Sequence, residues 1–151
     1  MEPEVRPNQD GRDLVHILAE FRYQLRTFLQ FSEQAAHEVS LHPQQHQLLL
    51  QVAGAPERTA ASIAYVAGRL GLRHNSAVEL VNRSVAEGLL VRTADSQDGR
   101  RVALDITRKG RRILKMLSQA HARELRELGP LLVRSLKRIE RAGRTRIRRS
   151  Q

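Results

Sequence analysis

The sequence predicts a mainly α chain of the α+β class, in which a central motif stands between long helices at both ends. Three observations predict this class. Apolar residues recur at helical spacing over most of the chain. The central stretch Thr59–Thr107 changes from helical to alternating spacing, and the pair Asp98-Gly99 within it favours a tight hairpin turn.

The N-terminal segment predicts one long amphipathic helix after a short polar leader. Residues 1–10 combine Pro3 and Pro7 with charged and amide side chains, so we expect a disordered leader there. From Leu14 to Ala36 apolar residues keep helical spacing, and all three phenylalanines of the protein lie in this segment. We therefore place a long helix within residues 11–40.

Residues 41–107 predict a compact lobe. Pro43 suits the first position of a short helix and keeps His42 out of the α region. Thr59 is then expected to cap a helix that ends at Gly71, and a second helix follows with Val78, Val81 and Val85 inward. Two helices joined by a Gly-containing turn and followed by a hairpin form a winged helix-turn-helix.

The C-terminal segment predicts two further helices within residues 108–142. Thr107 is expected to cap the first of them, and Gly129-Pro130 is expected to end it. A final helix would carry Leu132 and Leu136. Residues 143–151 form a basic tail, for which we expect either contacts to phosphate or a poorly ordered end.

Charge is distributed unevenly along the 151 residues. The formal net charge is +10, with −3 in residues 1–58 and +13 in residues 59–151. The basic excess therefore begins where the helix-turn-helix begins. Clustered cations release counterions from nucleic-acid phosphates, so double-stranded DNA is the expected partner.

Several kinds of chemistry are not expected. The chain has no Cys, so disulfides and thiolate nucleophiles are excluded. No Gly-rich phosphate loop and no acidic cluster beside a His appear, so we expect no enzyme and no cofactor. His42 and His46 have a spacing that suits a metal, but Pro43 turns His42 off the helix and we expect no metal site. No apolar run approaches a membrane span, so we expect a cytoplasmic protein.

The segments LRHNSAVELVNRSVAEGLLVR and DSQDGRRVALDITRKG resemble the recognition helix and wing of the MarR family of dimeric bacterial transcription regulators. The resemblance covers roughly residues 12–142. It implies that residues 11–40 and 108–142 are dimerisation helices and that residues 41–107 are a DNA-binding lobe. It further implies a homodimeric, sequence-specific regulator at a pseudo-palindromic operator, expected to be a repressor relieved by a small-molecule effector.

The resemblance assigns candidate DNA contacts to the second helix and the wing. On the helix they are Arg73, His74, Asn75, Ser76, Glu79 and Arg83. Asn75 and Ser76 are equally well interpreted as helix caps. In the wing, Arg100 is the candidate for the minor groove and Arg101 for an ion pair with Asp95 or Asp98, although Gly99 makes the two roles exchangeable. A solvated hairpin tip is the alternative.

The remaining candidates concern the dimer and the effector. The expected dimer interface comprises Leu14, Ile17, Phe21, Phe28, Leu132 and Leu136. The effector implied by the resemblance is a small aromatic or lipophilic anion, with Arg22, Arg26 and His46 as candidate anchors. Salt-bridged surface charges are the commoner interpretation of such residues. Ser84 stands where the family generally has an apolar residue, which leaves open which face Arg83 presents.

The sequence is also compatible with two other functions. A winged fold also serves as a protein-interaction module. A strongly basic half also suits a sequence-indifferent, nucleoid-type DNA-binding protein.

Overall fold

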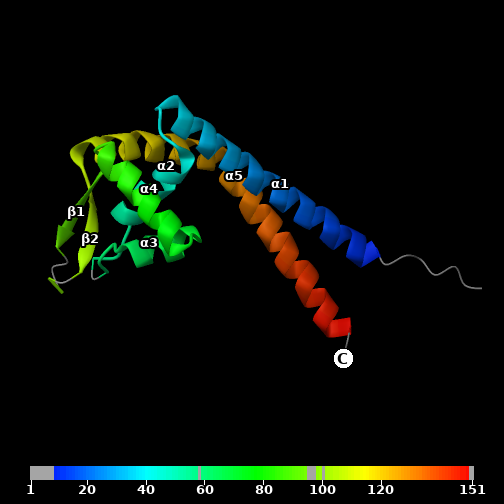
Figure 1. Cartoon of the computed structure of the whole chain (residues 1–151). Coiled ribbons are helices and arrows are strands. Elements are labelled where there is room, and N and C mark those ends of the chain that lie inside the picture. The colour runs from blue at the N-terminus through cyan, green and yellow to red at the C-terminus, as the bar shows by residue number, and fades with distance from the viewer. Residues whose placement is uncertain (1–8, 58, 95–97, 100, 150–151) are drawn as a thin grey trace, which may run out of the picture. The chain divides into compact units, whose positions relative to one another are not determined.

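The computed structural model describes residues 9–57, 59–94, 98–99 and 101–149 (Figure 1). Residues 1–8 of the predicted leader lie outside this description, and its last two residues, Gln9 and Asp10, belong to the first helix, so the predicted boundary at residue 10 is wrong. The elements are α1 (Gln9–Glu38), α2 (Pro43–Ala53), α3 (Ile63–Leu70), α4 (His74–Ala86), β1 (Leu90–Ala94), β2 (Val102–Ile106) and α5 (Arg108–Arg149). The predicted winged helix-turn-helix between long terminal helices is thus confirmed.

The chain divides into two compact units, and each is described by itself. The lobe comprises residues 32–120, and the terminal-helix unit comprises the described residues of 1–31 and 121–151. In the lobe, α2, α3 and α4 gather beside the hairpin (Figure 1). The hairpin is a two-stranded antiparallel sheet in which Arg92 pairs with Leu104.

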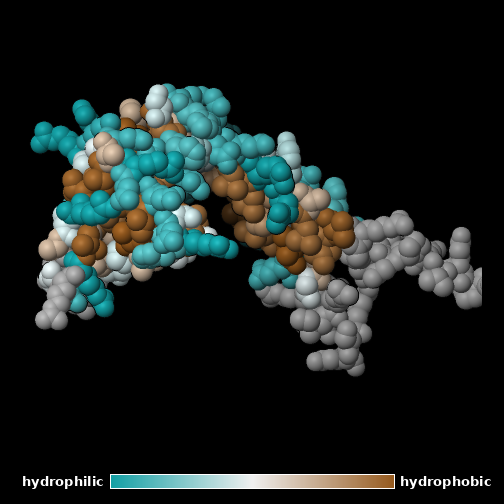
Figure 2. Space-filling view, in the orientation of Figure 1, coloured by the Kyte–Doolittle hydropathy of each residue, from teal (hydrophilic) through white to brown (hydrophobic). Residues whose placement is uncertain are grey.

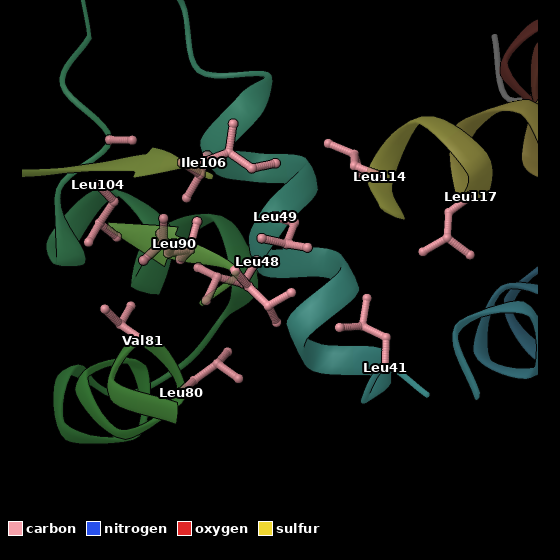
Figure 3. Packing of buried hydrophobic residues seen from close by; sticks show 14 of the residues in the cluster. Leu41, Leu48, Leu49, Leu80, Val81, Leu90, Leu104, Ile106, Leu114 and Leu117 are labelled. Carbon is pink, nitrogen blue, oxygen red and sulfur yellow. The ribbon is translucent and has the colours of Figure 1, made fainter. Parts of the chain in front are cut away.

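The core of the lobe is apolar and closed. Figure 3 shows Leu48, Leu90 and Val81 pointing toward one another from α2, β1 and α4. Leu48 and Val81 are 0% exposed, and Leu90 is 1% exposed. Full burial of one such side chain contributes about 1.5–3 kcal/mol, so these contacts fix α4 against the hairpin.

The helix-turn-helix begins three residues later than the sequence predicts. Ser62, not Thr59, caps α3, because the Ser62 hydroxyl accepts a hydrogen bond from the Tyr65 N–H at 3.1 Å. The residue before Ser62 is not helical, and its carbonyl is bonded to the hairpin instead: the Ala61 carbonyl accepts from the Leu104 N–H at 2.9 Å. The end of α3 is as predicted: Gly71 adopts φ 64°, a left-handed conformation that favours glycine.

The junction between the wing and α5 is tightly bonded. Thr107 caps α5 as predicted, because its hydroxyl accepts from the Gly110 N–H at 3.0 Å. The same hydroxyl donates to the Gly88 carbonyl at 2.6 Å. A Cβ at position 110 would overlap the carbonyl oxygen of Leu89, so only glycine allows α5 to start this close to the wing.

The predicted break at Gly129-Pro130 is wrong, because α5 is one helix from Arg108 to Arg149. Proline removes a single hydrogen bond, which would have ended on the Arg126 carbonyl, and its φ suits a helix. Pro130 is exposed, so water can satisfy that carbonyl. Apolar residues continue at helical spacing on both sides, and their packing offsets the cost.

Candidate nucleic-acid interface

The second helix of the motif, α4, has one buried face and one exposed face. Its buried side chains are Ala77, Leu80, Val81 and Ser84. Val81 is therefore inward as predicted, whereas Val78 and Val85 are only partly buried at the edges of this face. The opposite face carries Asn75, Glu79 and Asn82, which are exposed and share one line of the helix at spacings of four and three.

The burial of Ser84 shows which face of the second half of α4 packs against the core of the lobe. Its side chain is 0% exposed, and its hydroxyl donates to the Leu80 carbonyl at 2.8 Å. The buried hydroxyl is thus satisfied within the helix, which lets a polar residue occupy an apolar position. Arg83, the next residue toward the N-terminus, is exposed.

The six predicted contact residues on this helix are all exposed: Arg73, His74, Asn75, Ser76, Glu79 and Arg83. The capping role is excluded for Asn75 and Ser76, since Arg73 occupies the N-cap position and α4 begins at His74. The Arg73 side chain makes no capping hydrogen bond. The first turn of α4 therefore presents its backbone N–H groups beside an exposed amide and an exposed hydroxyl.

The opposite end of α4 is anchored to the rest of the lobe. The buried Gln45 side chain donates to the Glu87 carboxylate at 2.9 Å, and its own oxygen accepts from the His42 N–H at 3.2 Å. Lys109 donates to the Glu87 carbonyl at 2.8 Å. These bonds hold the C-terminal end of α4 while its N-terminal end faces solvent.

The wing contains one of the predicted ion pairs. Arg101 lies 3.5 Å from the Asp98 carboxylate, measured from Nε to Oδ2, and both side chains are exposed. The Arg101 N–H also donates to the Asp98 carbonyl at 2.9 Å, which closes the hairpin turn. Asp95 and Arg100 lie outside the described residues, so their predicted roles stay predictions.

A further contact links the wing to α4, and the sequence interpretation did not include it. Arg92 on β1 donates from Nη2 to the Asn82 Oδ1 on the exposed face of α4. The signal was present in the sequence, because strand alternation places Arg92 on the same side of β1 as the buried Leu90. Only the fold shows that this side meets α4.

The candidate effector residues have contrasting environments. Arg22 and Arg26 are exposed on α1 in the terminal-helix unit, whereas His46 is 3% exposed inside the lobe. Their grouping into one pocket therefore stays a prediction.

The terminal-helix unit uses part of the predicted dimer interface within the chain. Ile17 is 5% exposed, and the rings of Phe28 and Phe31 meet His121 edge-on at centroid distances of 5.7 and 5.5 Å. Ser135 donates to Gln24 at 3.1 Å across the same two helices. The face of α1 that packs on α5 thus includes Ile17 and Phe28, which the sequence analysis assigns to the contact with a second copy.

A second apolar face of these helices stays exposed. On α1 it includes Val15, Leu18 and Leu29, which are 68%, 41% and 55% exposed, and on α5 it includes Leu125 and Leu136, at 39% and 50%. Figure 2 shows hydrophobic side chains gathered on the surface of the terminal helices. Of the remaining predicted interface residues, Leu14, Phe21 and Leu132 are partly buried.

Comparison with known proteins agrees with this geometry. Residues 39–101 match the sequence model of the MarR family. No curated protein sequence matches significantly. No helix in the described part of the chain is long and apolar enough to cross a membrane.

Solved structures share the fold. A MarR family protein from Bacillus stearothermophilus is 19% identical, with a TM-score of 0.69 over 90% of this chain and 97% of that one. The transcriptional repressor CouR bound to a 23-mer DNA duplex is 29% identical, with a TM-score of 0.60 over 83% and 87% of the two chains. CouR from Rhodococcus jostii RHA1 bound to p-coumaroyl-CoA is 23% identical, with a TM-score of 0.58 over 66% and 68%.

Proposed function

The chain belongs to the MarR family of transcription regulators, and on this premise we propose that it is a homodimeric, sequence-specific repressor that binds double-stranded DNA. The observation that carries the proposal is the exposed polar face of α4, with the first turn of the helix pointing to solvent. A major groove admits a helix in this way, and residues near the helix N-terminus contact base edges. CouR, at 29% identity, is described as a repressor and was solved with DNA.

Each candidate contact has a matching chemistry on DNA. Asn75 suits adenine, and Arg73 and Arg83 suit guanine or phosphate. The uncapped first turn of α4 offers N–H groups to a phosphate. In the wing, Arg100 is proposed to enter the minor groove, where narrow width concentrates negative potential, and the Asp98–Arg101 pair supports the hairpin.

Dimer formation is supported by the exposed apolar face of the terminal helices. Large apolar patches on isolated subunits commonly mark protein interfaces. We propose that Val15, Leu18 and Leu29 of α1, with Leu136 of α5, pack against a second copy of this chain. Two lobes held in this way can address half-sites about 34–36 Å apart, which predicts a pseudo-palindromic operator.

The proposal includes release of DNA by a small aromatic or lipophilic anion. Support comes from CouR, which was solved with p-coumaroyl-CoA, and from the exposed cations Arg22 and Arg26 on α1. An anion that releases DNA from the native protein but not from the Arg22→Ala, Arg26→Ala double variant would support these anchors. Equal release from both proteins would remove them from the site.

Binding to a duplex selected from a randomised library tests the DNA-binding function. We expect the selected duplex to bind at least a thousandfold more tightly than random duplex at physiological salt, roughly the lower end of the usual specificity range. Equal affinities with a steep salt dependence would favour nucleoid-type binding. No binding to either duplex would favour a protein-interaction module.

The variant Asn75→Ala tests the role of α4. We expect it to lose about 1–3 kcal/mol of discrimination at one base pair of each half-site, because one amide contact is removed. Gln44→Ala is the matched control, since Gln44 is an exposed amide at the start of α2. Equal behaviour of the two variants would exclude Asn75 from base recognition.

A further inference from the structure

The contact between Arg92 and Asn82 joins two exposed side chains from different elements of the lobe. Asn82 shares the outward line of α4 with Asn75 and Glu79. At 1.5 Å per residue, Asn82 lies about 10 Å further along the helix than Asn75, or roughly three base-pair steps. A recognition helix that lies along the groove can therefore bring Asn82 to a different base pair.

The fold explains why Arg92 reaches α4. Arg92 is opposite Leu104 in the hairpin, and the Leu104 side chain is 5% exposed on the face that packs against the lobe. Leu90, two residues before Arg92, is buried on the same face. Arg92 continues this row at the point where the core ends, so its guanidinium emerges beside the exposed surface of α4.

The chemistry of the contact fixes the orientation of the Asn82 amide. A guanidinium group only donates hydrogen bonds, so the amide must present its oxygen to Arg92. A flipped amide would set two donors against each other. The Nδ2 group of Asn82 consequently faces away from Arg92, and its two N–H donors are available to another acceptor.

We propose that Asn82 contacts a base edge in the major groove and that Arg92 is the positioning residue that holds its amide for this contact. The proposal rests on the DNA-binding function proposed above. Acceptors suited to the Nδ2 group are N7 of adenine, N7 or O6 of guanine and O4 of thymine. Arg92 thereby contributes to sequence preference from the wing without touching the base itself.

Single-base variants of the selected duplex provide the test. Asn82→Ala is expected to lose roughly tenfold preference at one base pair of each half-site. Arg92→Ala is expected to lose preference at the same base pair, and the double variant should lose little more, because Arg92 acts through Asn82. Arg92→Lys, which keeps a donor for the Asn82 oxygen, is expected to retain part of that preference.

Asn82→Asp separates positioning from base contact. The carboxylate keeps an acceptor for Arg92 but loses the N–H donors, so the preference should move toward cytosine, whose amino group donates. The matched control is Arg112→Ala, which removes one exposed cation of α5 from the same lobe. This control lowers the net charge by one unit, as Asn82→Asp does, and should leave the single-base preferences unchanged.

Each contrary result has a distinct meaning. Arg92→Ala could instead lower the affinity for all duplexes equally and reduce the slope of log affinity against log salt concentration by about one. Arg92 would then contact phosphate, and the positioning role would be overturned. If the native protein selects a sequence and both Asn82 variants keep the same preference for it, the base contact is overturned while the proposed function stands. If the native protein selects no sequence at all, both proposals fail. Circular dichroism of each variant confirms that the helices are intact.

Discussion

The lobe and the terminal-helix unit differ in how completely they bury their large apolar side chains. In the lobe, Leu48, Leu49 and Val66 are 0% exposed. In the terminal-helix unit, Val15 and Leu29 are 68% and 55% exposed, although Ile17 and Leu128 are buried. The lobe completes a core from its own residues, although Leu50, Val91, Val102 and Met116 stay 40–52% exposed. The terminal helices bury one face and leave the line of Val15, Leu18 and Leu29 open, which supports the proposed dimer.

Each unit also has a buried polar residue that hydrogen-bonds between two of its elements. In the lobe, the buried Gln45 has both ends of its amide bonded, to Glu87 and to the His42 N–H, and so ties α2 to the end of α4. In the terminal-helix unit, Ser135 is buried and bonded to Gln24, which is partly exposed. Both hydrogen bonds are partly buried, so the two units differ in their apolar side chains and not in these polar contacts.

The largest expected effect is in the lobe. Leu48→Ala should lower the free energy of unfolding by about 2–5 kcal/mol, because it leaves a cavity in a core that cannot close around it. The chain has two tyrosines and no tryptophan, so Tyr23→Phe leaves Tyr65 of α3 as a fluorescence probe of the lobe. Urea unfolding of Leu48→Ala in that background, at fixed protein concentration, measures the loss. A loss below 1 kcal/mol would contradict a closed core.

A smaller effect, on assembly instead of folding, is expected for Leu29→Asp. The side chain is 55% exposed in one chain, so the variant should fold, but burial of its charge in a dimer costs several kcal/mol. We expect at least a hundredfold weaker dimerisation by sedimentation equilibrium, roughly 2.7 kcal/mol. Tyr23→Asp is the control, because Tyr23 is 66% exposed on the same helix but lies off the line of Val15, Leu18 and Leu29. An unchanged dimer in Leu29→Asp would place the interface elsewhere.

The smallest effect is expected for Ser135→Ala. The hydroxyl donates a single hydrogen bond to Gln24, so its removal should cost about 0.5–1.5 kcal/mol. Thermal unfolding followed by circular dichroism measures this loss. A loss as large as that of Leu48→Ala would show that the two units do not differ as the exposures indicate.

Most of the fold could be predicted from local signals. The spacing of apolar residues marks the helices, Pro43 and Gly71 mark two of their ends, and the alternation around Asp98-Gly99 marks the hairpin. Two boundaries were wrong because they depend on distant residues. Ala61 is bonded to Leu104 of the hairpin instead of joining α3, and α5 continues through Pro130 with Leu128 and Ser135 buried on either side of it.

The candidate interface was predicted only in part. The exposed positions of α4 follow from its pattern, because residues three and four apart share a face. Pairings between elements did not follow, since no local pattern brings Arg92 to Asn82 or Gln45 to Glu87. The same limit applies to α1, where Phe28 and Leu29 are both apolar and only the fold shows that Phe28 meets His121 while Leu29 stays exposed.

By itself, the sequence determined the order of the elements, the winged helix-turn-helix class and the basic character of residues 59–151, because each depends on neighbours along the chain or on composition. Tertiary structure decided which apolar face of α1 is used within the chain, which residue caps α3 and which wing residue meets α4. These outcomes depend on contacts between residues far apart in sequence, and such contacts exist only after the chain has folded.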